Sequence, residues 1–225
     1  MRFSSAALAV TGLAALSTAL PSLPIRFGTT SSGIAKRDAT PAADIVLAIA
    51  PKSGDCTNAP FADECATNVQ AARPLVDAMA AYGIYNPAQI AAVLSVMAFE
   101  SGDFKYNKNH NPGRAGQGTR NMQLIKYNVL FARSKDELKD KVPEGDADSM
   151  TDDQKNAVLA LVMADPYNYE TGPWFLATQC EQSVRDTLAS NPDAGWAAYM
   201  RCINVASTDD RTAYWTRAKA AFGLA

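Results

Sequence analysis

A glutamate at the end of a predicted helix has the residue type and position for proton transfer. Glu100 closes an apolar stretch that includes Val93, Val96 and Met97, and at 100° per residue it falls on the apolar arc of that helix. Glu100 also lies near the helix C-terminus, where the negative end of the helix dipole disfavours a negatively charged side chain. Both effects favour the protonated acid, which can donate its proton to a leaving oxygen. The sequence therefore presents Glu100 as a candidate general acid.

A structural role is the alternative for Glu100, in which its carboxylate pairs with Arg114 or Arg120. A polar segment rich in Asn, Gly and Lys, residues 102–120, follows the helix. Loops of this length inside a compact domain are usually functional or disordered. The segment leads into the motif Asn121–Met122–Gln123.

Glu100–Ser101, the polar segment and Asn121–Met122–Gln123 together resemble the lysozyme-like superfamily, specifically goose-type lysozymes and lytic transglycosylases. Those enzymes carry a catalytic glutamate in a Glu-Ser motif at a helix end, followed by a Gly-Leu-Met-Gln-like motif. Here Arg120–Asn121 stands where Gly-Leu is usual. The segment 172–175 and Cys180 are also similar to secreted fungal proteins of this type. The resemblance implies a mainly α, lysozyme-like helical domain with long polar loops.

The resemblance further implies a muramidase-type glycoside hydrolase that needs no cofactor and cleaves β-1,4 bonds of peptidoglycan, with Glu100 as general acid. Asp103 is the nearest second carboxylate, although capping of the loop is an alternative role. The substrate-binding candidates are Ser101, Asn121, Met122, Gln123 and Tyr169. Hydrolysis and transglycosylation both remain open. Two other functions are a chitin or chitosan hydrolase and a non-catalytic secreted protein that binds glycan or a host molecule.

The N-terminal residues predict secretion to the extracellular space. Residues 1–19 read as a signal peptide, with Arg2, an apolar run and the small residues 17–19. Residues 20–37 read as a pro-segment that ends in the dibasic pair Lys36–Arg37. A single catalytic domain over 38–225 follows. The apolar run is too short to span a membrane, and no other segment predicts a membrane contact.

The charge balance excludes nucleic acid as a partner. Residues 1–37 hold four of the 21 Lys and Arg residues and none of the 23 Asp and Glu residues, so residues 38–225 carry a formal charge of −6 instead of −2. Nucleic-acid binding requires a basic surface. A single histidine and the lack of a Cys-x-x-Cys motif argue against a metal site. An acidic surface and disulfides favour a monomer.

The four cysteines predict two disulfides in a secreted protein. Four cysteines allow three connectivities. We favour Cys56–Cys65 and Cys180–Cys202, because each pair closes a local loop.

Apolar periodicity predicts helices and no strands in the body of the chain. Asn86–Pro87 is a helix start with an Asn cap, and Thr151 caps another helix. The expected helices cover residues 63–82, 87–100, 122–132, 152–162, 174–180, 182–188, 194–202 and 209–222.

Overall fold

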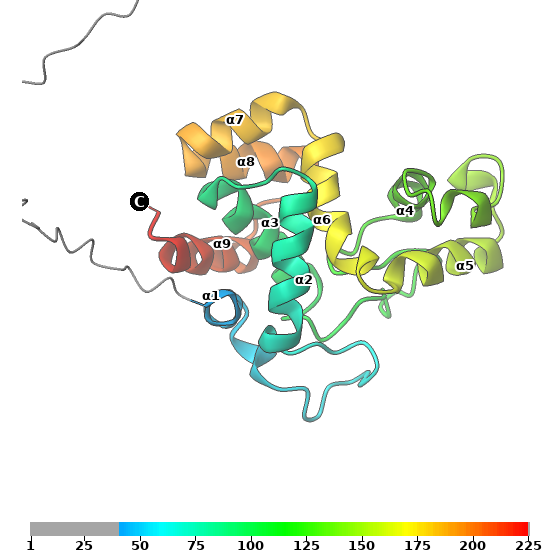
Figure 1. The fold of residues 1–225 in the computed structure, drawn as a ribbon, viewed down its shortest axis with the longest axis horizontal. Helices are drawn as coiled ribbons and strands as arrows, with labels where there is room; N and C mark the ends of the chain where they lie inside the picture. Colours follow the sequence, from blue (N-terminus) through cyan, green and yellow to red (C-terminus); the bar gives the residue numbers. More distant parts are fainter. Residues whose placement is uncertain (1–40, 225) are drawn as a thin grey trace, which may run out of the picture. The chain divides into compact units, whose positions relative to one another are not determined.

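The computed structural model describes residues 41–224. The predicted signal peptide and pro-segment lie outside this range, so secretion and processing stay predictions. The described helices are α1 (Ala42–Ile49), α2 (Asn68–Ala81), α3 (Pro87–Glu100), α4 (Ile125–Arg133), α5 (Asp152–Met163), α6 (Tyr167–Thr178), α7 (Gln182–Ser190), α8 (Pro192–Cys202) and α9 (Asp209–Phe222). Pairing of extended backbone in this range is limited to isolated bridges at Gly118. The predicted mainly α fold is confirmed (Figure 1).

Several helices begin at side chains that cap their free N–H groups. Thr67 and Thr151 each form a capping box with a glutamine three residues later, at the starts of α2 and α5. Asn86 accepts from two backbone N–H groups at the start of α3, which has Pro87 in its first turn. Each such cap stabilises its helix by about 1 kcal/mol. These local signals explain why the sequence correctly predicts the starts of α3 and α5, whereas α2 begins at Asn68 and not at the predicted residue 63.

The buried apolar side chains form two hydrophobic clusters. The first surrounds α3 and receives side chains from α1, α2, α8 and α9, whereas the second lies among α4, α5 and α6. In Figure 1, α3 lies near α9, and α4 and α5 lie together on the other side of α6. Helix α6 contributes Leu176 to the first cluster and Trp174 and Phe175 to the second. The two clusters therefore share this helix.

Helix α6 approaches α3 closely at Gly172. A Cβ atom added at Gly172 would lie 2.6 Å from the Met97 sulfur and 3.3 Å from Val93 Cγ1. Both of those side chains belong to α3 and are fully buried. Glycine at this position therefore lets the two helices pack without a side chain between them.

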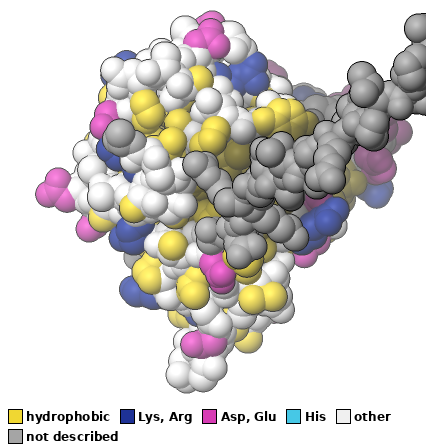
Figure 2. Space-filling model, turned by 60° about the vertical axis from the view of Figure 1, so that its left-hand side comes forward, with side chains coloured by type: hydrophobic (Ala, Val, Ile, Leu, Met, Phe, Trp, Pro, Cys, Tyr) yellow, Lys and Arg dark blue, Asp and Glu magenta, His cyan; other side chains and the backbone are white. Residues whose placement is uncertain are grey.

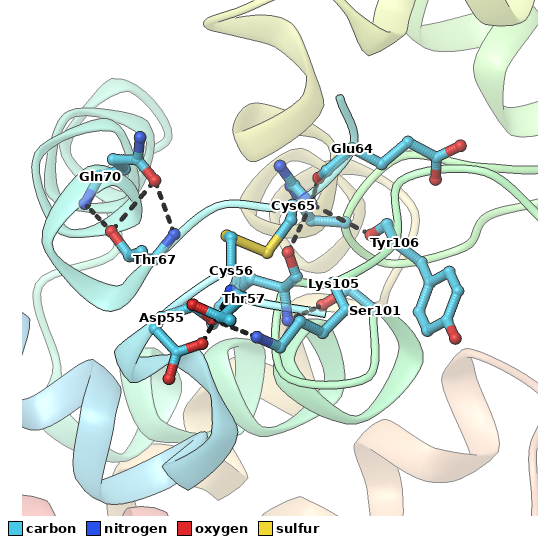
Figure 3. Close-up of a disulfide and its surroundings, with 12 residues drawn as sticks. Asp55, Cys56, Thr57, Glu64, Cys65, Thr67, Gln70, Ser101, Lys105 and Tyr106 are labelled. Atoms are coloured by element: carbon cyan, nitrogen blue, oxygen red, sulfur yellow. Dashed lines mark hydrogen bonds between the residues drawn. A yellow bond between two sulfur atoms is a disulfide. The ribbon is translucent and has the colours of Figure 1, made fainter. Parts of the chain in front are cut away.

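Both predicted disulfides are present, Cys56–Cys65 and Cys180–Cys202. Figure 3 shows the first one beside Thr67 and Gln70 at the start of α2 and beside Lys105, whose ammonium donates to the carbonyl oxygen of Asp55. The second joins the residue two positions after α6 to the last residue of α8. The second disulfide thus links the C-terminal ends of α6 and α8, and the first closes the loop that precedes α2.

Apolar side chains also reach the surface. Figure 2 shows hydrophobic side chains at many places on the face that it turns forward, some of them adjacent to one another. A hollow of about 230 Å³ has an almost wholly apolar lining from α1, α2, α3 and Phe222. None of the described helices has the length and hydropathy that crossing a membrane requires.

Candidate functional site

A cleft of about 390 Å³ with both polar and apolar walls contains Glu100. Its walls come from α3, the segment 114–127, α6, α8 and the stretch from α8 into α9. The polar lining side chains are Glu100, Arg114, Gln117, Asn121, Gln123, Lys126, Asn204 and Arg211. Apolar and aromatic lining comes from Val96, Met122, Leu124, Tyr127, Phe175, Tyr199, Ile203 and Val205.

Glu100 forms an ion pair with Arg211 of α9. Arg211 Nη2 donates to Glu100 Oε1 at 2.8 Å, and the two side chains are only 19% and 21% exposed. The Arg211 guanidinium also lies 4.4 Å from the centroid of the Phe99 ring. The carboxylate therefore has a fixed cationic partner. The sequence had placed Arg114 or Arg120 in that role.

Arg120 is instead a buried anchor for the polar loop. Its Nη1 donates to the carbonyl oxygens of Glu64, Phe104 and Tyr106 at 2.7, 3.1 and 3.1 Å. Its Nε donates to Asn168 Oδ1 at 3.2 Å. Such a buried guanidinium requires several acceptors, since an unpaired buried charge is very costly. Arg120 thereby fastens the polar loop to α6.

Tyr169, a predicted substrate-binding residue, is buried and does not line the cleft. It is 2% exposed, and its ring lies 5.2 Å from the Arg120 guanidinium. Burial raises the pKa of the Tyr169 hydroxyl. Its surroundings indicate a packing role beside Arg120.

Ser101 and Asp103 hold the chain reversal after α3. Ser101 Oγ donates to the Met97 carbonyl at 2.6 Å and accepts from the Phe104 N–H at 3.0 Å. Asp103 is 1% exposed and accepts from the Tyr214 hydroxyl and, at 2.8 Å, from the Lys52 N–H. Burial, followed by the contact with Asp103, raises the pKa of Tyr214. Both side chains are therefore committed to the fold, and Asp103 lies outside the cleft lining.

The motif Asn121–Met122–Gln123 does line the cleft. Gln123 Nε2 donates to Asn128 Oδ1 at 2.8 Å, and Gln123 Oε1 accepts from Asn121 Nδ2 at 3.2 Å. Met122 adopts a φ of 47°, a left-handed conformation that is costly for a residue with a side chain. Asn204, on another wall, has a φ of 56°. Such strained backbone is concentrated at functional sites in proteins.

Two cations of the cleft lack an anionic partner. Within residues 41–224, the side chains of Arg114 and Lys126 make no hydrogen bond or ion pair with another residue. Lys126 Nζ lies 4.6 Å from the centroid of the Tyr127 ring. Arg211 is the third cation, and Glu100 is the only carboxylate among the described lining residues. Local sequence spacing gave no signal for this gathering of positive charge.

Comparison with known proteins identifies one informative relative. A Fusarium oxysporum (strain Fo5176) protein named bifunctional dioxygenase (DOX)-epoxy alcohol synthase (EAS) is 43% identical over 172 residues. The matched region covers 75% of this chain but 13% of the Fusarium protein. No family model and no solved structure matches the chain.

This relative overturns the lysozyme-like resemblance. Its name is that of a dioxygenase and synthase, so the predicted muramidase-type glycoside hydrolase is wrong, as are the chitin and chitosan hydrolase alternatives. The resemblance depended on two short motifs. The pairing of Glu100 with Arg211 and the burial of Asp103 give those residues other roles.

Side chains of the types that bind metal ions do not gather into a metal site within residues 41–224. Residues 41–224 contain no group of three His, Cys, Asp or Glu side chains placed to hold a metal ion. His110, the single histidine of the sequence, has its Nε2 2.7 Å from Glu64 Oε1 and stacks on Phe61 at 3.5 Å. All four cysteines are in disulfides.

Proposed function

We propose that the chain is a binding protein that holds an amphipathic carboxylate, with one anionic group and an apolar body, in the cleft beside Glu100. The observation that supports this most directly is the pair of unpartnered cations, Arg114 and Lys126, on the cleft wall. The proposal concerns recognition and assigns no reaction to the chain.

Charge is the first argument. Residues 38–225 carry a formal charge of −6, yet three cations and one carboxylate line this cleft. A positive site on an acidic protein concentrates anions locally. The planar guanidinium of Arg114 suits a carboxylate, because its N–H groups can donate to both oxygens at once.

The apolar part of the lining is the second argument. Leu124 is 38% exposed, and Ile203 and Val205 are partly exposed, so this wall offers apolar surface to a ligand. A ligand with a hydrocarbon body would bury its apolar surface there, at about 25 cal/mol for each Å² removed from water. The volume of about 390 Å³ is within the usual range for small-molecule sites.

The relative supports a binding module more than a complete enzyme. The chain spans about an eighth of the Fusarium protein, so the matched region is one small part of a chain with two named activities. The described residues do not fit a metal centre. We therefore propose that the chain binds a ligand of the kind that oxygenating enzymes handle, without performing the named reactions.

Calorimetric titration with hexanoate tests the proposal, with hexan-1-ol as the neutral ligand of equal length. We expect hexanoate to bind and hexan-1-ol to bind more weakly. The double variant Arg114→Gln/Lys126→Gln should weaken hexanoate binding by about tenfold or more, since hydrogen bonds to charged groups are the strong ones.

The matched control is Lys141→Gln/Arg201→Gln. It removes two exposed positive charges that do not line the cleft. We expect this control to bind hexanoate as the parent chain does. Equal weakening of hexanoate binding in both double variants would show that net charge explains the loss. It would contradict a site at Arg114 and Lys126. No binding of hexanoate by the parent chain would contradict the proposed function itself.

A further inference from the structure

The carboxylate of Glu100 lies in the same cleft as the cations Arg114 and Lys126, where it opposes the binding of an anion. We propose that Glu100 makes the cleft selective for ligands with a single anionic group, because it occupies Arg211, which would otherwise bind a second one. This inference rests on the proposed function and concerns the specificity of that same site.

Arg211 is held in place by contacts that do not involve Glu100. Its guanidinium lies over the Phe99 ring at 4.4 Å, an attraction between a cation and the ring face. Its Nη1 donates to the Ala206 carbonyl oxygen at 3.4 Å. Both contacts remain when the charge of Glu100 is removed. Arg211 would then still face the cleft with an unneutralised positive charge.

Glu100 acts on a ligand in two ways. Its Oε1 accepts from Arg211 Nη2 at 2.8 Å, which is the contact that an incoming carboxylate would need. Its own negative charge in a cleft wall also repels any second anionic group that approaches. Among the described residues, no donor forms a hydrogen bond to Glu100 Oε2. Arg211 is therefore the single hydrogen-bond donor to this carboxylate within that range.

A monoanion avoids this conflict. Its carboxylate binds at Arg114 and Lys126, and its apolar body then runs along Leu124, Ile203 and Val205. A dianion of the same length brings its second carboxylate to a cleft in which Glu100 already neutralises Arg211. Specificity of this kind comes from disfavouring the wrong ligand, not from an added contact to the right one.

The Glu100→Gln variant tests the inference. The amide keeps the shape of the side chain and can still accept from Arg211, but it has no charge. The parent chain should bind hexanoate more tightly than hexanedioate. In Glu100→Gln the affinity for hexanedioate should rise by about tenfold or more, and by a larger factor than the affinity for hexanoate. The preference of the parent chain for hexanoate would thus be reduced or lost.

Two further variants make the result specific. Glu100→Gln/Arg211→Gln should lose the gained affinity for hexanedioate, because it lacks the second cation. Asp210→Asn removes one negative charge from the first turn of α9, beside Arg211 but outside the cleft lining. It should keep the preference of the parent chain for hexanoate. Thermal melting of each variant confirms that it is folded.

The failures of the two proposals can be told apart. If the parent chain binds hexanoate and Glu100→Gln gains no affinity for hexanedioate, Glu100 does not set the specificity and the proposed function stands. An equal gain in Asp210→Asn also contradicts the inference, since general charge would then explain it. If neither the parent chain nor Glu100→Gln binds either acid, the proposed function fails and this inference fails with it.

Discussion

Lys135 and Glu170 form an ion pair that joins the end of α4 to α6. Lys135 also lies 5.2 Å from the centroid of the Tyr82 ring and 5.1 Å from that of Phe131. The Tyr82 hydroxyl donates to Glu170 Oε2 at 3.1 Å. The lysine thus connects Tyr82, which directly follows α2, with side chains of α4 and α6 through one charge.

We expect Lys135→Met to lower the free energy of unfolding by about 2 kcal/mol, because it leaves Glu170 partly buried without its cation. Urea denaturation of the parent chain and the variant measures this loss. The double variant Lys135→Met/Glu170→Gln should recover part of it, since no carboxylate is then unpaired. A double variant less stable than the single one would show that the stability comes from packing of Glu170.

The contacts among Lys135, Glu170 and Tyr82 also predict a loss of stability at alkaline pH. Burial lowers the pKa of Lys135, but hydrogen bonds to Glu170 and Tyr82 outweigh it and raise the pKa above the ordinary 10.5. Burial also raises the pKa of Tyr82 above 10.0. Groups with a raised folded pKa contribute stability that is present below the unfolded pKa and falls as pH rises through the folded value. Denaturation midpoints should therefore fall from about pH 10 upwards, and a constant midpoint there would contradict these shifts.

Gly172→Ala should destabilise the contact between α6 and α3. The added Cβ would lie 2.6 Å from the Met97 sulfur, so the flexible methionine must move inside a packed core. Overpacking of this kind costs about 1–3 kcal/mol. Gly54→Ala is the control, because its Cβ would meet only Leu47 Cδ1 at 3.6 Å. Thermal melting of both variants checks the prediction, and equal stability of the two would contradict it.

Removing the Cys180–Cys202 disulfide should affect both stability and the cleft. Its loop has a sequence separation of 22, for which loop-closure entropy predicts a loss of about 3 kcal/mol in a double serine variant. The cleft residues Ile203, Asn204 and Val205 directly follow Cys202, so hexanoate should also bind less tightly. Replacing Cys56 and Cys65 is the comparison, since neither lines the cleft. Unchanged hexanoate binding in the Cys180→Ser/Cys202→Ser variant would show that the disulfide does not hold this wall.

The parts of the fold that carry local signals could be predicted from the sequence. Helix α3 begins at the Asn86 cap, and the helix runs over the predicted range 87–100. The helix predicted over 174–180 begins earlier, at Tyr167, because Gly172–Pro173 reads as a break in the sequence but packs inside α6. Helix α1 was not predicted at all. Packing against other helices, which local patterns do not contain, decides both cases.

The site was harder to predict than the fold. Glu100 and Arg211 are 111 residues apart in the chain, so no motif links them. Arg120 is adjacent to the predicted Asn121–Met122–Gln123 motif, yet its side chain donates to the carbonyl oxygens of Glu64 and Phe104. The type of a polar residue shows what it can bind, but its partner depends on tertiary contacts that a single sequence does not show.

Helix α6 has a consequence for how the molecule unfolds. Because its side chains belong to both hydrophobic clusters, neither cluster can come apart without exposing apolar surface of the other. We expect the described helices to melt in one cooperative transition, as small single domains usually do. The cleft draws its lining from elements of both clusters, so it exists only in the fully folded chain. Its opening must then come from side chains and loops such as 114–124, and not from hinged movement of two independent halves.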